Sequence, residues 1–67
     1  MELAKTKSEW IKEFAKDELA NNTQIEAHAE EIGITVKEFA KSIAEIEFNT
    51  RLQEGSLVKV GRRYKLV

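Results

Sequence analysis

The absence of cysteine from a chain of 67 residues most constrains how this sequence can fold. Neither disulfides nor thiolate zinc sites can reinforce the small core of such a chain, which buries only about 60% of its unfolded surface. Stability must therefore come from well-capped helices packed on one compact apolar core. The composition fits, since 42% of the residues are hydrophobic, 34% are charged and proline is absent. We expect one ordered, helix-rich domain over residues 1–67.

Helix-start and helix-stop signals predict three helices, over residues 8–20, 24–32 and 36–47. Each start has a hydroxyl residue with a glutamate three positions later, the capping-box spacing that satisfies free amides. These pairs are Thr6 with Glu9 (Ser8 is the alternative N-cap), Thr23 with Glu26, and Thr35 with Glu38. Asn21-Asn22 and Gly33 are typical of helix ends, because they tolerate left-handed backbone.

Apolar residues recur at helical spacing within each predicted helix. The expected buried stripes consist of Trp10 or Ile11 with Phe14 and Leu19, of Ile25, Ala29 and Ile32, and of Phe39, Ile43 and Ile46. Phe48 and Leu52 fall off the third stripe, so either the helix breaks near Glu47 or these two side chains pack against another element. Asn49 and Thr50 are weak helix formers, which favours the break.

The last eleven residues, 57–67, alternate apolar and basic side chains and predict a β-hairpin over residues 57–66. Val58, Val60, Tyr64 and Leu66 share an inward face if Val60 lies opposite Tyr64 and Val58 opposite Leu66. That register predicts a three-residue tip over residues 61–63. It also places Lys59 opposite Lys65, a repulsion that a phosphate backbone would relieve.

Charge is unevenly distributed along the chain. Residues 1–50 contain six Lys and eleven Asp or Glu, a net charge of −5, whereas residues 51–67 contain five cations and one Glu, a net charge of +4. An asymmetry of this kind indicates an anionic partner for the C-terminal end.

The stretch AHAEEIGIT, Ala27 to Thr35, followed by VKEFAKSI, places a small residue, Ala29, four positions before Gly33. The small residue lets two helices cross closely, and the glycine permits a tight turn between them. Together with the closing GRRYKL, this pattern resembles the winged helix-turn-helix superfamily of DNA-binding domains over about residues 8–67. The expected fold class is therefore mainly α with a C-terminal β-hairpin, the wing.

The resemblance implies that residues 36–47 are a recognition helix in the DNA major groove, and that the wing meets the minor groove or the backbone. Lysines on the outer helix face would contact guanine edges or phosphates, serine and glutamate would contact base edges, and the helix start would contact a phosphate. Arginines at the wing tip would favour narrow A·T-rich minor grooves. The candidate DNA-binding residues are Thr35, Lys37, Glu38, Lys41, Ser42, Lys59, Arg62, Arg63 and Lys65.

Simpler interpretations of the same residues remain open. Glu38 can serve only its capping box, and Arg62 and Arg63 can be soluble turn residues that protect a sheet edge. Winged-helix domains also act as protein-interaction modules, and fold alone does not settle function. The interpretations are therefore a small transcriptional regulator, an A·T-preferring architectural DNA binder, and a protein-interaction module.

Catalysis finds little support in the sequence. With one histidine, His28, and no cysteine, a nucleophile–base pair would have to rest on that histidine and a surface Ser or Thr. The sequence has no glycine-rich phosphate loop, and its scattered carboxylates lack metal-ligand spacing. We expect a non-enzyme without cofactor, metal or small-molecule ligand. No apolar run approaches the ~18 residues of a membrane span, so we expect a cytoplasmic protein, nucleoid-associated if bacterial.

A single DNA-binding domain of this size makes few base contacts. We therefore expect a homodimer or a cooperative array on DNA, with the first helix and the N-terminal segment as the available interface. A bacterial, phage or plasmid setting is expected. Alternatively, the chain is an excised DNA-binding domain whose oligomerisation part lies outside it.

Overall fold

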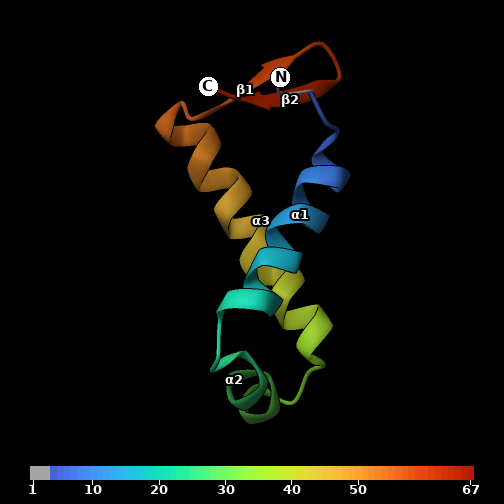
Figure 1. Ribbon diagram of the computed structural model, residues 1–67, viewed down its shortest axis with the longest axis vertical. Coiled ribbons are helices and arrows are strands. Elements are labelled where there is room, and N and C mark those ends of the chain that lie inside the picture. Colours follow the sequence, from blue (N-terminus) through green and yellow to red (C-terminus); the bar gives the residue numbers. More distant parts are fainter. Residues whose placement is uncertain (1–3) are drawn as a thin grey trace.

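The computed structural model describes residues 4–67, which form three α-helices followed by a two-stranded antiparallel hairpin (Figure 1). The elements are α1 (Lys7–Asn21), α2 (Ile25–Ile32), α3 (Val36–Glu54), β1 (Leu57–Val60) and β2 (Arg63–Leu66). The predicted fold class is confirmed, because the chain is mainly helical and its elements follow the order of a winged-helix layout. Residues 1–3, part of the N-terminal segment expected at an interface, lie outside the described residues.

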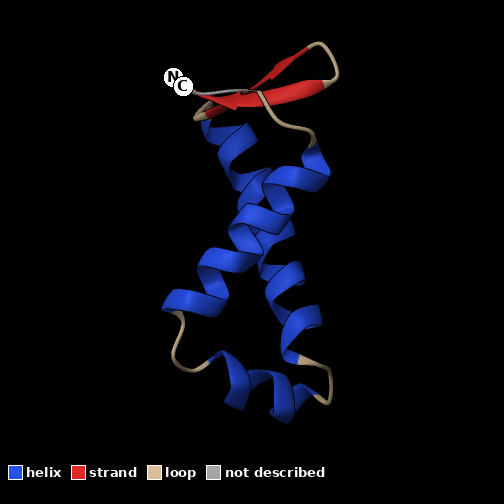
Figure 2. Ribbon diagram, turned by 45° about the vertical axis from the view of Figure 1, so that its right-hand side comes forward, coloured by secondary structure: helices blue, strands red, loops and turns tan. Residues whose placement is uncertain are grey.

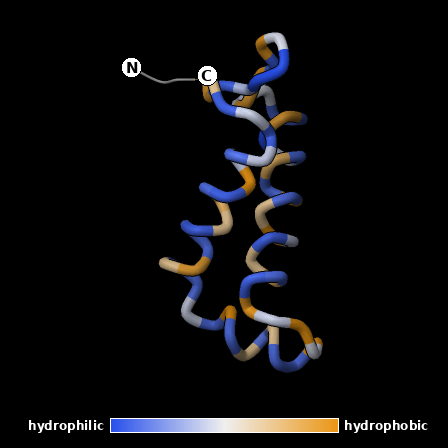
Figure 3. The backbone as a smooth tube through the Cα atoms, turned by 90° about the vertical axis from the view of Figure 1, so that its right-hand side faces the viewer, coloured by the Kyte–Doolittle hydropathy of each residue, from blue (hydrophilic) through white to orange (hydrophobic). Residues whose placement is uncertain are grey.

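The two long helices, α1 and α3, lie side by side, run antiparallel and cross each other (Figures 1 and 2). Helix α2 lies at one end of this pair and the hairpin at the other. The molecule is elongated, with extents of 38 × 22 × 17 Å. Hydrophobic residues recur between hydrophilic ones along both long helices (Figure 3). None of the helices within residues 4–67 has the length and hydropathy of a bilayer-spanning segment.

The three predicted capping boxes have different outcomes. At α1 the box is complete, because Thr6 Oγ1 accepts from the Glu9 amide and Glu9 Oε1 accepts from the Thr6 amide. At α3 Thr35 Oγ1 accepts from the Glu38 amide at 3.1 Å. The box at Thr23 was wrong, since Gln24 is the N-cap of α2 and makes no side-chain cap bond. The side chain of Asn22 instead accepts from the Gln24 amide at 3.1 Å.

The tight turn between α2 and α3 depends on Gly33, whose φ of 88° lies in the left-handed region. Its amide donates to the carbonyl oxygens of Ala29 and Glu30, which closes the last turn of α2. On α2, Ile25 and Ala29 are buried, but Ile32 is 63% exposed.

The predicted break in the third helix was wrong, because α3 continues to Glu54 and ends at the left-handed Gly55. Its buried face consists of Ala40, Ala44 and Phe48, and the expected stripe residue Ile46 is 66% exposed. The physical reason is energetic. Asn and Thr cost a helix at most about 0.7 kcal/mol each, whereas burying one Phe side chain contributes about 1.5–3 kcal/mol.

The last turns of α3 are further held by Arg51. Its guanidinium lies 3.2 Å from Glu47 Oε1, one helical turn back, and 5.0 Å above the ring of Phe14 on α1. Phe39 and Ile43, predicted to be buried, are half-buried, and the ring of Phe39 lies 6.1 Å from that of His28 on α2.

The predicted register of the hairpin was also wrong by one residue. Leu57 pairs with Leu66, Lys59 with Tyr64 and Val60 with Arg63, so the tip holds two residues, Gly61 and Arg62. Gly61 has a φ of 65° and Arg62 has no positive φ, which is the pattern of a type II′ turn. A two-residue tip of this type matches the twist of the strands, and it separates Lys59 from Lys65.

The one-residue shift changes which side chains of β1 enter the core. Leu57 is buried, and Tyr64 and Leu66 pack against the same core, which includes Trp10, Phe14 and Phe48. Val58 and Val60, predicted to face inward, share the outer face with Arg63 and Lys65 instead. Leu57 displaces them because it is larger and lies directly after the turn that follows Gly55.

The backbone of Tyr64 joins the hairpin to the start of the chain. Its carbonyl oxygen accepts from the Lys5 amide at 2.8 Å and from the indole Nε1 of Trp10 at 2.7 Å. Its amide donates to the carbonyl oxygen of Lys5 at 2.7 Å, so the segment before α1 is joined to β2 by an isolated antiparallel β-bridge. The Tyr64 ring packs edge-on against Phe48, with 4.9 Å between centroids.

Replacing Phe48 tests the observed face of α3. Phe48→Ala should lower the free energy of unfolding by about 3–5 kcal/mol, because it empties a fully buried site. Ile46→Ala, on the exposed face, should change it by no more than about 0.5 kcal/mol. Urea denaturation followed by far-UV circular dichroism measures both. Equal effects of the two substitutions would contradict the observed burial.

Replacing Trp10 tests the bond to the hairpin. Trp10→Phe keeps an aromatic ring in the core but removes the indole donor, so we expect a loss of about 1–2 kcal/mol of stability. Amide exchange of β2 should accelerate more than that of α2, which Trp10 does not hold. Unchanged exchange at Arg63–Leu66 would argue against this bond as the tie between helix and hairpin.

Candidate nucleic-acid interface

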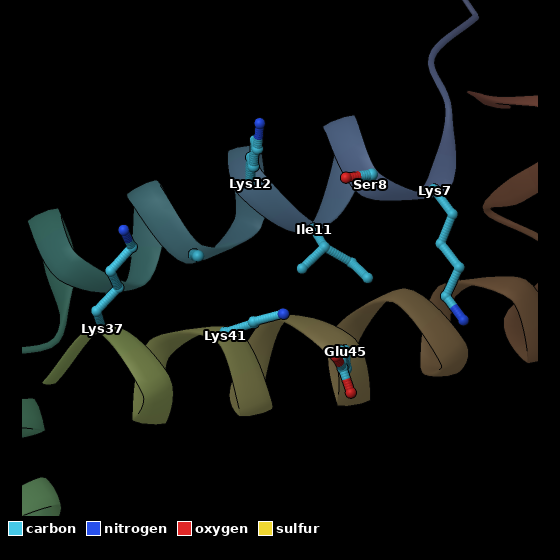
Figure 4. A pocket seen from close by; sticks show the side chains of 8 residues that line it. Lys7, Ser8, Ile11, Lys12, Lys37, Lys41 and Glu45 are labelled. Carbon is cyan, nitrogen blue, oxygen red and sulfur yellow. The ribbon is translucent and has the colours of Figure 1, made fainter. Parts of the chain in front are cut away.

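A groove of about 570 Å³ runs between α1 and α3 on one side of the molecule (Figure 4). Four of its eight lining residues are lysines, and Glu45 alone among the eight is acidic. The lining consists of Lys7, Ser8, Ile11, Lys12 and Ala15 from α1, and Lys37, Lys41 and Glu45 from α3. The groove therefore combines an apolar floor with a cationic rim.

Helical spacing explains why these residues meet. Lys37, Lys41 and Glu45 are each four residues apart, so they form one line along the edge of α3. On α1, Ser8 and Lys12 form a similar line beside Ile11. Ala40 and Ala44, which are fully buried, allow the two helices to approach closely enough for both lines to border one groove.

The lysine side chains cover the apolar floor with their stems and leave their ammonium groups in water. All four are exposed. Figure 4 shows Ile11 between the two helices, with Lys41 extending along α3 and Lys7 reaching toward it. The ammonium of Lys7 lies 5.6 Å from the centre of the Phe48 ring, which marks the end of the groove nearest the hairpin. Mobile ammonium groups of this kind suit contacts with phosphates more than exact base reading.

Sequence analysis identified only half of this cationic rim. Lys37 and Lys41 were predicted site residues and line the groove, whereas Lys7 and Lys12 were missed. The signal in the sequence was the flanking of buried Ile11 by lysines at residues 7 and 12. That signal becomes informative only when α1 is known to lie against this edge of α3.

Three other predicted residues of α3 have partners within the helix. Thr35 accepts from the Glu38 amide, and Ser42 Oγ donates to the carbonyl oxygen of Glu38 at 3.1 Å. Thr35 therefore caps the helix through the Glu38 amide, but the exposed Glu38 carboxylate makes no return bond to Thr35, so the predicted capping box at α3 is only half formed. These contacts do not occupy every acceptor of the hydroxyl groups or of the Glu38 carboxylate.

The four predicted cations of the hairpin fall into two groups. Arg63 is held within the protein, because its Nη1 donates to the carbonyl oxygen of Ala4 at 3.3 Å and lies 3.7 Å from Glu9 Oε1. Lys59, Arg62 and Lys65 are exposed, and no side-chain hydrogen bond or ion pair engages them within residues 4–67. Arg62 lies in the two-residue tip.

The predicted site residues do not gather at one point. Thr35 precedes α3 at the α2 end, whereas the hairpin cations lie at the opposite end (Figure 1). Since α3 has 19 residues, these ends are about 28 Å apart. The groove lysines lie between these ends, and they form a line of cations along α1 and α3.

Metal and family comparisons complete the description of the site. No cluster of three or more His, Asp or Glu side chains suited to a metal ion occurs in the described part of the chain. Comparison with protein-family models, with curated proteins and with solved structures found no significant match.

The pKa of Glu9 is lowered from its ordinary value of 4.5, first by the backbone amide of Thr6, then by the Thr6 hydroxyl, and less by Arg63 and Lys5. A lowered folded-state pKa adds stability above the ordinary value, and this stability is lost as pH falls through the folded-state pKa. Wild type should therefore lose more stability than Glu9→Gln between about pH 6 and about pH 3.

Urea unfolding at several pH values and NMR titration of the Glu9 carboxylate measure this effect. Asp17→Asn is the matched control, because Asp17 is an exposed residue of the same helix outside the capping box, and its carboxylate has no ion pair within residues 4–67. Identical pH dependence of wild type and Glu9→Gln would contradict the assigned role.

Proposed function

We propose that this protein binds double-stranded DNA without catalysing a reaction, as a small transcriptional regulator. The observation that carries the proposal is the groove between α1 and α3, where four lysines and one glutamate gather on a chain of net charge −1. A cluster of cations on a protein whose net charge is negative supports an anionic partner.

The length of the cationic line supports a polymer over a single small anion. Lys37 and Phe48, the ring beneath Lys7, are eleven residues apart on α3, which is about 17 Å. A groove of this length is longer than one phosphate group and can follow several successive phosphates of a nucleic-acid strand. One phosphate or carboxylate would engage only part of it.

In this proposal α3 lies at the major groove and a phosphate backbone follows the rim between α3 and α1. Lys37 and Lys41 contact this backbone or adjacent guanine edges, while Lys7 and Lys12 contact the backbone from the α1 side. Ser42 and Glu38 face bases near the start of α3. Lys59 and Lys65 add backbone contacts from the hairpin.

A second candidate function, A·T-preferring architectural binding, is favoured by Arg62. It lies at a narrow two-residue tip and is not engaged by another described side chain, so it can enter a minor groove. Arg63 fits this role less well, because Glu9 and Ala4 hold it. We propose a cytoplasmic location for either function, in contact with the nucleoid if the source is bacterial.

Fluorescence anisotropy with labelled A·T-rich and G·C-rich duplexes over a salt series tests the proposal. The double variant Lys12→Ala/Lys41→Ala should weaken binding roughly tenfold and reduce the slope of log K against log salt by about 2, because two phosphate contacts are lost. Lys16→Ala is the control, since it removes a lysine of α1 that does not line the groove.

The outcomes separate the interpretations. Base preference lost on changing Lys37, Lys41 or Ser42 supports the regulator, whereas A·T preference abolished by Arg62→Ala supports the architectural binder. If no duplex binds at low salt, both DNA proposals fail, and a protein-interaction module becomes the better description. Equal losses in the groove variant and in Lys16→Ala would reject the groove as the site.

A further inference from the structure

The two ends of the elongated molecule carry opposite charge. Residues 17–36, which include α2 and its flanking turns, contain five carboxylates and neither Lys nor Arg. Residues 55–67, which include the hairpin, contain four cations and neither Asp nor Glu. Figures 1 and 2 place α2 and the hairpin at opposite ends of the long axis.

The hairpin end is also partly apolar. The observed register turns Val58 and Val60 to the face opposite the core, beside Arg63 and Lys65. Val60 is 50% exposed, and Arg62 extends from the tip of the same hairpin. This outer face of β1 and β2, formed by Val58, Val60, Arg62, Arg63 and Lys65, is called the hairpin face below.

The α2 end has the complementary composition. With Ile25 and Ala29 buried against the rest of the protein, α2 exposes its three glutamates, Glu26, Glu30 and Glu31. Ile32, its last residue, is 63% exposed, so this end of the molecule presents an apolar side chain together with the glutamates. Glu30 and Glu31 point away from the buried side of α2, with Glu26 and Ile32 at its two sides. The surface formed by these four residues is called the α2 face.

We propose that the hairpin face of one copy binds the α2 face of a second copy, head to tail. The occupant is identified by complementarity, because a cationic surface around Val60 and an anionic surface beside Ile32 belong to the same chain. Their separation along the 38 Å axis prevents them from meeting within one molecule. A contact between two different faces does not close on itself, so it builds an open linear array.

The size of the ends limits the strength of this contact. The cross-section of 22 × 17 Å allows each copy to bury roughly 400 Å², or less than about 1,000 Å² in total. Contacts of that size are weak and transient. The electrostatic attraction between the two faces is screened by salt, so association is expected at high protein concentration and low ionic strength.

The array goes beyond the proposed DNA binding and does not require it. Arg62 and Lys65 belong to both surfaces, so the test is done without nucleic acid. It also differs from association through α1, which sequence analysis favoured, because α1 contributes no residue to either face.

Two charge-reversed variants test the contact: Arg62→Glu/Lys65→Glu on the hairpin face and Glu30→Lys/Glu31→Lys on the α2 face. All four positions are exposed, and Arg63 is left intact because it holds Ala4 and Glu9. Circular dichroism verifies the fold of each variant. Sedimentation equilibrium and concentration-dependent amide chemical shifts measure self-association of millimolar protein.

Wild type should self-associate at low salt, with shift changes at both ends, and should be monomeric in about 1 M salt. Each variant alone should lose at least tenfold in association constant, because its two faces then carry like charge. An equimolar mixture of the two variants should restore association, since each reversed face finds its complement on the other variant.

Several results would overturn the proposal. These are a wild type that stays monomeric at low salt, an α2-face variant that associates as wild type does, and a mixture that fails to recover. The control Lys12→Glu/Lys41→Glu makes the same change in net charge within the groove and should keep self-association while losing DNA binding. DNA binding and self-association can therefore fail independently.

Discussion

The hydrogen bond from the Trp10 indole to the carbonyl oxygen of Tyr64 ties α1 to β2, which lie near opposite ends of the sequence. The same carbonyl accepts from the Lys5 amide, while the Tyr64 ring packs on Phe48 of α3. One residue of β2 thus contacts the start of the chain, α1 and α3. In a domain without disulfides, a two-stranded hairpin is marginal by itself, so its attachment to the helices determines whether it is ordered.

The position of the hairpin in turn sets the length of the molecule. Because α3 continues through Phe48 to Gly55, it carries the hairpin away from α2 and from the turn between α2 and α3. The continuous α3 also gives α1 a long partner, and the groove forms along this pair. The separation of the charged ends therefore depends on the packing of Phe48 into the core, whereas the α3 residues of the groove, Lys37, Lys41 and Glu45, all precede Phe48.

The elongated pairing of α1 with α3 connects the two proposals. A side of the molecule lined by Lys7, Lys12, Lys37 and Lys41 suits a polyanion that runs along the long axis. The ends, by contrast, have unlike charges and exposed apolar side chains. The groove lysines contribute to neither end surface, so binding of a polymer along the groove leaves the α2 face free for a neighbouring copy, while Arg62 and Lys65 are shared between the two proposed contacts.

Local signals in the sequence determined the number and order of the elements. Thr6 with Glu9, Thr35 with Glu38, and Gly33 act within one helical turn, so their chemistry can be read without knowledge of the fold. They gave the starts of α1 and α3 and the turn between α2 and α3, and the alternation after Gly55 gave the hairpin. The charge asymmetry is likewise a property of sequence alone.

Tertiary structure decided what local signals leave open. Asn49 and Thr50 weaken a helix only slightly, and the burial of Phe48 outweighs this cost. Which face of α3 is buried depends on the position of α1, and Ile46 lies on the exposed face. The hairpin register was decided by Leu57 filling the core, which moved Val58 and Val60 to the outer face. Lys7 and Lys12 joined the candidate site only because α1 packs against that edge of α3. The sequence by itself determined which helices and strands form, because their signals are short-range. Packing between residues that are distant in the sequence determined which side of each element is buried.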